Sequence, residues 1–377
     1  MKIYLKQLHW QIFLSMVIGL IIGSIIDSDS AFYSISTTLG VIFIKLLKMI
    51  TIPLIFTSIL TGITSISDFN QLGRIGFKTI SYYMLTSLFA IIIGLGLTNI
   101  LKPGNSYAHS EATKVYDYSN LNTPDSTLDI FVRMIPTNPI AAATEGDMLS
   151  IIFFTILLGI AITKLPKAHK EPLTSFFESL FQAIMNLTQM IIKLSPIGVF
   201  GLIVKTVSTS NLDLFYSIGK YMITIAIGLS IHVFIVLPML FFILTRINPL
   251  KHFKAMSSAM ATAFSTSSSS STLPVTIKCV NENVKASKEV SGFVLPMGAT
   301  INMDGTALYE CAGVIFISQI LGIELTITQQ LIVVITALLA SIGAAGIPSA
   351  GLVMIFIVTQ AVGFRNEDVA LIIGAML

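Results

Sequence analysis

The stretch NMDGT, residues 302 to 306, lies inside an apolar segment, and a run of five serines at residues 267 to 271 precedes it by one short apolar arm. An ionised aspartate within a membrane-spanning segment costs roughly 2.5 to 3.5 kcal/mol on insertion scales, and such residues usually mark the path of an ion or a substrate. Asp304 is therefore predicted to act at membrane depth, and the rest of the chain is interpreted around it.

The composition predicts an all-α polytopic membrane protein. Of the 377 residues, 54% are hydrophobic and only 11% are charged, which is far too apolar for an ordinary soluble domain. The formal net charge of +3 arises from lysines in short loops, so it reports topology. We expect no nucleic-acid partner. Cys279 and Cys311 show neither CxxC nor Cys/His spacing, so they are interpreted as packing residues rather than as a disulfide or a zinc site.

Six long apolar runs come first, because a spanning helix needs about 20 apolar residues. They predict helices at about 10–27, 39–66, 75–101, 130–163, 173–206 and 212–245. The first run resembles a signal peptide, but its length and the spans that follow favour an uncleaved helix. Lysine and arginine gather at alternate ends, which places the N-terminus in the cytoplasm. The polar residues 103–129 are predicted to form an external loop.

The last third of the chain breaks this simple pattern. The interrupted run 253–280 has lysines on both sides, which indicates a segment that enters and leaves on one face of the membrane. A span at 290–322 follows, interrupted at residues 302–305. The run 326–364 then forms a second broken hairpin, with the small residues 341–351 at its tip. Two such tips approaching from opposite sides indicate inverted repeats and a transport site between them.

Asn302 and Asp304 are candidate cation ligands. They are two residues apart, so a regular helix would direct them to different sides. Gly305 makes local unwinding plausible, and side-chain and carbonyl oxygens could then converge on a hard cation such as sodium. The alternative is a buried pair that only bonds neighbouring helices.

The serine run offers hydroxyls and, at a hairpin tip, backbone N–H groups for an anionic ligand, although serine is also common in helix packing. Thr306 and Glu310 are spaced i, i+4. Glu310 could carry a proton or meet a counter-ion, and a structural partner in a neighbouring helix is an equally good interpretation.

Other polar groups have weaker signals when taken alone. Tyr83, Thr86 and Ser87 lie on one helix face, where interhelical hydrogen bonding is the more common role. His232 is interpreted as a packing or hydrogen-bonded residue. The chain contains no GxSxG, HExxH or Walker motif, so we predict that it is not an enzyme and that transport would use an ion gradient.

Five motifs carry a resemblance to a known family: SSSSTLP at 268–274, NMDGTALY at 302–309, the segment from Ala340 to Gly351, IPTNP at 135–139 and SPIGVF at 195–200. Together they resemble the dicarboxylate/amino acid:cation symporter family, the glutamate-transporter-like proteins, over nearly the whole chain. The resemblance implies a homotrimer in the plasma (cytoplasmic) membrane that binds a small anionic substrate within the lipid bilayer. It implies no cofactor other than sodium ions or protons as coupling ions.

The resemblance also implies a division into scaffold and transport domains that move by an elevator-type mechanism. The scaffold would comprise helices 1–2 in residues 1–74 and, after the external loop, helices 4–5 in 103–210. The transport domain would comprise helix 3 in 75–102 and residues 211–377, with helix 6, hairpin 1, helix 7, hairpin 2 and the start of helix 8. The second hairpin would be the external gate.

Site residues follow from the same motifs. One sodium would be held by Gly298 and Asn302. A second would be held, partly by carbonyls, by Thr300, Met303, Ser341, Ile342 and Ala344. A third would be held by Tyr83, Thr86, Ser87, Asn302 and Asp304. The substrate would contact Ser267, Ser268, Ser269, Thr306, Ile347 and Gly351.

Two departures from the family pattern bear on function. Some members have Arg where this chain has Ser267, and those without it usually have an Arg in the last helix. That helix begins near Val369 here and the chain stops at Leu377, so a truncated last helix is expected. The predicted function is symport of an acidic amino acid or a C4 dicarboxylate with sodium or protons. Neutral amino-acid symport, an ion-conducting channel and, last, an intramembrane serine hydrolase are the alternatives.

Overall fold

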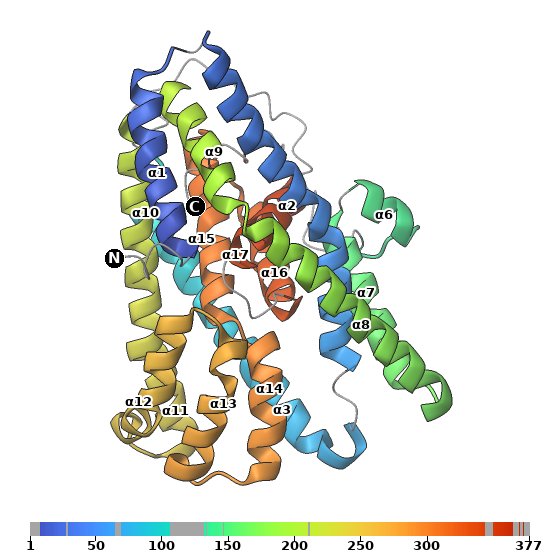
Figure 1. The fold of residues 1–377 in the computed structure, drawn as a ribbon. Helices are drawn as coiled ribbons and strands as arrows, with labels where there is room; N and C mark the ends of the chain where they lie inside the picture. The colour runs from blue at the N-terminus through green and yellow to red at the C-terminus, as the bar shows by residue number, and fades with distance from the viewer. Residues whose placement is uncertain are drawn as a thin grey trace.

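The computed structural model describes residues 8–27, 29–64, 69–105, 132, 134–145, 147–209, 212–343, 350–364, 369 and 372. Within these ranges every element of regular structure is a helix (Figure 1). The predicted all-α architecture is therefore confirmed.

The first half of the chain forms seven described helices. Their bounds are α1 Leu8–Ile25, α2 Ala31–Thr64, α3 Phe69–Leu101, α6 Pro139–Glu145, α7 Met148–Thr163, α8 Lys167–Ile192 and α9 Ser195–Thr209.

Two of the predicted single spans are divided. The run 130–163 contains α6 and α7, and Asp147 caps α7: its carboxylate accepts from the Ser150 backbone N–H at 3.5 Å and from the Ser150 hydroxyl at 2.8 Å. The run 173–206 contains α8 and α9, which meet at an angle of 51°. Pro196 is the second residue of α9, where its missing N–H costs no helical hydrogen bond.

The second half begins with one long helical path: α10 Leu212–Ile231, a π-helical turn η2 at His232–Val236, and α11 Leu237–Thr245. It continues with α12 Pro249–Thr266, α13 Ser269–Cys279, the π-helical turn η3 at Val280–Val284, α14 Lys288–Ile301, α15 Asp304–Ile320, α16 Ile327–Gly343 and α17 Ala350–Val362.

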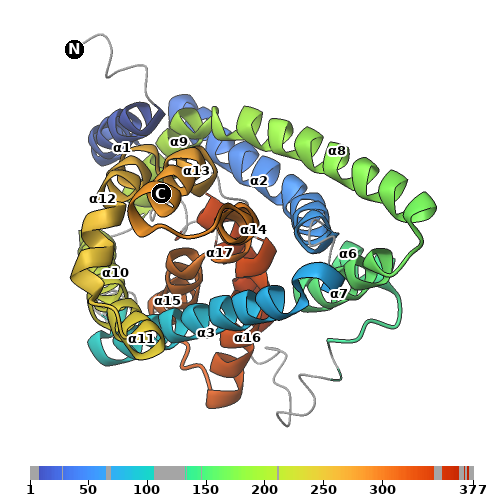
Figure 2. The same ribbon diagram turned by 90° about the horizontal axis from the view of Figure 1, so that it is seen from below.

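The helices form two packing groups (Figure 2). In the first group, α2 contacts α7, α8 and α9, and α1 packs along α9. In the second group, α15 is surrounded by α3, α10, α16 and α17. The groups meet where α2 contacts α16 and α17. The core of the second group contains many apolar side chains, with Ala307, Val314 and Phe316 fully buried on α15, and it also encloses polar residues such as Thr86 and Glu310.

Two helix pairs correspond to the predicted hairpins. The first pair, α12 and α13, turns at Ser267 and Ser268 and packs side by side. The second pair, α16 and α17, is also in contact, and its predicted tip at residues 344–349 lies outside the described residues. Below α16 and α17 in Figure 1, the helices α12, α13 and α14 form one end of the molecule.

Several helices have the length and apolar character of membrane spans. Among the described residues, Ala31–Thr64, Ile75–Leu101 and Tyr216–Thr245 each qualify alone, and α8 with α9 qualifies as a bent pair. Trp10–Ile25, Ser150–Thr163 and Ile327–Ser341 are shorter apolar helices. Many of their large side chains face outward, for example Phe77 at 72% and Ile100 at 77% exposure, as expected of surfaces that contact lipid.

Candidate functional site

The helix that carries Asp304 is interrupted. Asn302 (φ −97°, ψ 83°) and Met303 (φ −116°, ψ 60°) lie outside the helical region and separate α14 from α15. The Asn302 N–H donates the last bond of α14, to the Gly298 carbonyl at 3.1 Å. Asp304 then opens α15, where an acidic residue in the first turn is favoured by the helix dipole. The predicted break is confirmed, but it ends before Gly305, which belongs to α15.

The hydroxyl of Thr86 is surrounded by acceptor oxygens. Its Oγ1 lies 3.1 Å from the carbonyl oxygen of Tyr83. The same atom lies 3.2 Å from both Asn302 Oδ1 and Asp304 Oδ1. A hydroxyl has one proton and donates to one acceptor at a time, so acceptors outnumber donors around Thr86. Such a cluster can accommodate a cation, which would satisfy several oxygens at once.

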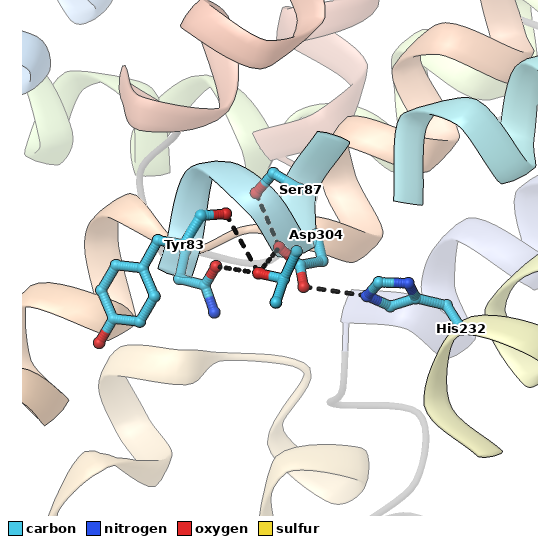
Figure 3. A network of polar contacts seen from close by, with 6 residues as sticks. Tyr83, Ser87, His232 and Asp304 are labelled. Carbon is cyan, nitrogen blue, oxygen red and sulfur yellow. Dashed lines mark hydrogen bonds and ion pairs between the residues drawn. The ribbon is translucent and has the colours of Figure 1, made fainter. Parts of the chain in front are cut away.

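Ser87 completes this oxygen cluster, which we define as Tyr83 O, Thr86 Oγ1, Ser87 Oγ, Asn302 Oδ1 and Asp304 Oδ1 (Figure 3). The Ser87 hydroxyl donates to Asp304 Oδ1 at 2.7 Å. Thr86 and Ser87 are fully buried, and the Asp304 side chain is 12% exposed. Oxygen ligands with one negative charge in a buried place fit a small hard cation such as sodium.

The phenol of Tyr83 serves the site indirectly. Its hydroxyl donates to the Val294 carbonyl at 2.9 Å, so the ring ties α3 to α14, whereas its backbone carbonyl faces Thr86. Tyr83 was predicted to be a ligand, but the sequence does not distinguish the role of its phenol from that of its backbone carbonyl. Gly298, also a predicted ligand residue, lies against this phenol: a Cβ on Gly298 would stand 2.7 Å from the Tyr83 hydroxyl oxygen.

His232 contacts the site, which sequence reasoning did not foresee. Its Nε2 lies 2.9 Å from Asp304 Oδ2, and its side chain is 3% exposed. The two residues are 72 positions apart, and a lone histidine in an apolar helix gives no signal of its partner. The only available signal was that both are rare polar residues in apolar helices of one bundle.

The predicted second sodium site is described in part. The Met303 side chain packs in one cluster with Ala340 and Met354, so the break lies beside α16 and α17. Ser341 is buried and donates to the Leu338 carbonyl at 2.8 Å. Ile342 lies in α16 and Thr300 in α14, but their side chains are outside the described part of the chain, as is the whole of Ala344.

The predicted substrate residues lie on three elements. Ser267 adopts the left-handed conformation (φ 49°) that ends α12, and Ser268 caps α13 by accepting from the Ser271 N–H at 3.3 Å. Ser267 and Ser269 are exposed, and Ser268 is buried. Thr306 lies in the first turn of α15 and is partly buried. Gly351 lies in α17, and Ile347 falls outside the described residues.

Glu310 is sealed inside the second helix group. It is 0% exposed, and neither carboxyl oxygen has a hydrogen-bond partner within the part of the chain that the structure describes. Thr306 and Glu310 both lie in α15, at the predicted i, i+4 spacing. Thr306 is nearer the surface and Glu310 is deeper in the bundle.

A polar cavity of about 370 Å³ lies at the other end of α15, lined among others by Asn99, Lys102 and Glu324. None of the predicted site residues lines it. The cavity therefore does not mark the candidate site, which lies at the helix break before Asp304.

These features define a class: a multi-pass helical membrane protein with a buried cluster of polar oxygen atoms at a broken helix. The chain belongs to the sodium:dicarboxylate symporter family, whose model matches residues 8–377. The predicted family is thus confirmed. Members of this family are transporters and not enzymes.

Individual relatives agree with this assignment. The mouse (Mus musculus) excitatory amino acid transporter 3 is 35% identical, with 97% of this chain and 80% of the relative covered. The proton/glutamate-aspartate symporter of Escherichia coli K12 is 33% identical, covering 98% and 86%. The proton/sodium-glutamate symport protein of Geobacillus stearothermophilus is 32% identical, covering 97% and 88%.

Proposed function

We propose that this protein is a secondary active symporter that takes up an acidic amino acid, glutamate or aspartate, or a C4 dicarboxylate together with sodium or protons. The observation that carries the proposal is the oxygen cluster around Thr86, where one hydroxyl proton faces three acceptors. Coupling to acidic amino acids is supported by the names of the bacterial relatives, which are glutamate symporters.

The cation would offset the burial of Asp304. An ionised carboxylate in a membrane protein is costly, and a bound sodium ion with oxygen ligands would neutralise it. The helix break supports this role because it supplies Asn302 Oδ1 and frees main-chain groups that a continuous helix would use internally. Gly298, Thr300, Met303, Ser341, Ile342 and Ala344 would contribute the other sodium positions.

The turn between α12 and α13 would bind a carboxylate of the substrate. Ser269 opens α13, and the N–H groups of a first helical turn have no acceptor within their own helix. Together with the helix dipole, they favour an anion, and the exposed Ser267 and Ser269 add hydroxyls. Ser268, Thr306, Ile347 and Gly351 would complete the substrate contacts.

The two helix groups would be the moving parts. We propose that the group around α2 is a scaffold, that the group around α15 is the transport domain, and that the latter moves in an elevator-type cycle within a homotrimer. The assignment is supported by packing, since each group is held mainly by contacts among its own helices. Both hairpins would enter the membrane without crossing it, with the N-terminus in the cytoplasm.

Glu310 would carry a proton or meet a counter-ion during the return step. This role is supported by the complete burial of the Glu310 side chain, whose carboxyl oxygens have no hydrogen-bond partner among the described residues. A group in that position gains from neutralisation, either by a proton or by a cation.

The test is uptake by the full chain reconstituted in liposomes. Labelled aspartate, glutamate and succinate are offered with an imposed sodium gradient, an imposed proton gradient or neither. We expect saturable uptake of at least one substrate with one of the gradients. Absence of gradient-driven uptake of all three would reject the proposal.

Two alternatives are resolved by added arms of this experiment. Labelled serine and alanine test neutral amino-acid symport. This alternative is considered because Ser267, exposed at the turn between α12 and α13, has no positive charge to pair with a second carboxylate of the substrate. Electrical recording tests an ion-conducting pore, because steady current without saturable substrate flux would indicate a channel.

A further inference from the structure

We propose that His232 is a positioning residue: its Nε2–H group holds the Asp304 carboxylate so that Oδ1 faces Thr86 and Ser87, and it thereby sets the cation affinity of the oxygen cluster. The inference rests on the proposed function, because it takes the cluster as a binding place for the coupling cation. It adds a residue that is not itself a cation ligand.

The carboxylate of Asp304 is held through both oxygens. Oδ1 accepts from Ser87 at 2.7 Å and lies 3.2 Å from Thr86 Oγ1, both on α3. Oδ2 lies 2.9 Å from His232 Nε2 on the path between α10 and α11 (Figure 3). Because the partners come from different helices, rotation of the carboxylate would break at least one hydrogen bond. Only Oδ1 is left to face a cation among the cluster oxygens.

Hydrogen-bond accounting assigns the proton of His232. A carboxylate only accepts, so Nε2 must donate to Oδ2. Nδ1 is buried and has no hydrogen-bond partner among the described residues, so a second N–H there would be a buried donor without an acceptor. The proposal therefore takes the Nε2–H tautomer, which leaves Nδ1 without a proton. It supplies a donor without a positive charge, so the negative charge of Asp304 remains available to a cation.

The backbone at His232 departs from a regular α-helix. His232 is the first residue of the π-helical turn, and its carbonyl accepts from the Leu237 N–H. Pro238 follows and has no N–H, so it cannot donate the α-helical hydrogen bond to the carbonyl four residues earlier. Single π-helical turns inside α-helices occur frequently at functional sites. Here the turn lies against α3, the helix that carries Thr86 and Ser87.

The test compares two substitutions of the same residue. His232→Leu removes the donor and keeps an apolar side chain, whereas His232→Gln keeps an amide N–H that can extend to a similar reach. His252→Gln is the matched control, because His252 stacks on Phe241 (ring centroids 4.7 Å apart) on a different helix. The readouts are the sodium-dependent rise in unfolding temperature in detergent and the sodium concentration for half-maximal aspartate uptake in liposomes.

We expect His232→Leu to raise the half-saturating sodium concentration roughly 10- to 100-fold, the usual effect of removing a group that orients a metal ligand. His232→Gln should recover most of this affinity, and aspartate affinity at saturating sodium should stay unchanged in both. Parent-like sodium dependence in His232→Leu would overturn the inference. Equal impairment of the Leu and Gln variants would also overturn it, since the ring would then be needed only for packing.

Failure of the sodium site, on which this inference rests, gives a different result. If sodium does not stabilise the parent protein, the cation site is wrong and the role of His232 is wrong with it. If sodium stabilises the parent and His232→Leu alike, only the role of His232 is wrong. Should His232→Leu fail to fold, His232→Asn takes its place, because its shorter amide cannot reach Asp304 Oδ2, and the same outcomes decide.

Discussion

Gly298 lies directly against the phenol of Tyr83: a Cβ on Gly298 would stand 2.7 Å from the Tyr83 hydroxyl oxygen. That hydroxyl is bonded to the Val294 carbonyl on the same helix as Gly298, so the contact sets the distance between α3 and α14. Tyr83, Thr86 and Ser87 lie on α3, and Asn302 directly follows α14, so the spacing of these two helices decides whether the cluster oxygens converge.

Gly298→Ala should therefore weaken sodium binding. The added methyl group must displace Tyr83, and overpacking of this kind costs about 1–3 kcal/mol. The measurement is the sodium-dependent shift of the unfolding temperature. Gly292→Ala, on the same helix with no heavy atom within 4 Å of the new Cβ, is the control and should behave like the parent. Equal sodium responses in both variants would contradict the prediction.

Asp304→Asn should abolish most of the sodium response while leaving the fold intact. The neutral amide keeps a carbonyl oxygen for Ser87 but removes the charge, and a hydrogen bond to a charged group is worth about 1.5–3 kcal/mol. Sodium affinity should therefore fall at least about tenfold. Glu178→Gln, at an exposed position on α8, controls for the loss of one carboxylate. Unchanged sodium affinity in Asp304→Asn would remove this residue from the site.

Thr86→Val should impair sodium binding, because the methyl group that replaces the hydroxyl cannot bridge Asn302 and Asp304. A further threonine on α3 provides the control: Thr98 is equally buried, and its hydroxyl donates to the Gly94 carbonyl of its own helix at 2.8 Å. Thr98→Val should leave sodium-dependent uptake unchanged. If both substitutions have the same effect, the loss arises from a general weakening of α3 and not from the cluster.

Gly201→Ala should destabilise the helix group around α2 without altering sodium affinity in the protein that folds. A Cβ on Gly201 would collide with the Ser36 carbonyl and stand 2.7 Å from the Gly40 nitrogen. We expect a loss of about 1–3 kcal/mol in unfolding free energy. Gly62→Ala, on α2 of the same helix group, should be neutral, because the added Cβ would meet no heavy atom of the described residues within 4 Å. A selective effect on sodium affinity would contradict the proposed division between scaffold and site.

Glu310→Gln should preserve folding and substrate binding but abolish uptake driven by a proton gradient. The amide has nearly the same shape as the carboxyl group and never ionises, so no charge has to be buried at this position. Exchange of labelled for unlabelled aspartate measures binding and translocation, and net uptake under a pH gradient measures the coupled step. Proton-driven net uptake at the parent rate would exclude Glu310 as the proton carrier.

Local sequence patterns predicted much of this fold. Runs of apolar residues located α2, α3 and the path from α10 to α11, because the length of a membrane span is visible in one dimension. The break beside Asp304 was predicted for the same reason: polar residues stand out in an apolar helix. The divisions at Asp147 and before Ser195 were missed. Glu145 and Asp147 interrupt the first apolar run, and Lys193 and Pro196 interrupt the second, but each interruption is short beside the length of its run, so both runs were interpreted as single spans.

The candidate site was less accessible to sequence reasoning. Tyr83, Thr86 and Ser87 could be recognised as a polar face, but their convergence on Asn302 and Asp304 depends on how α3 packs against α15. His232 could not be assigned a partner, because no local spacing connects it to a residue on another helix. Long-range side-chain pairs are a property of tertiary packing and leave no period in the sequence.

The π-helical turn at His232–Val236 has a consequence for the two ends of its helix. A π turn inserts one extra residue into an α-helical path, so each residue beyond it is rotated by roughly 100° relative to an uninterrupted helix. The lipid-facing side of α11 is thus fixed independently of the side that α10 turns toward α15. Shortening the chain by one residue within 233–236 would wind the turn back to α-helical register and force either the imidazole or the far end of the helix to face the wrong way.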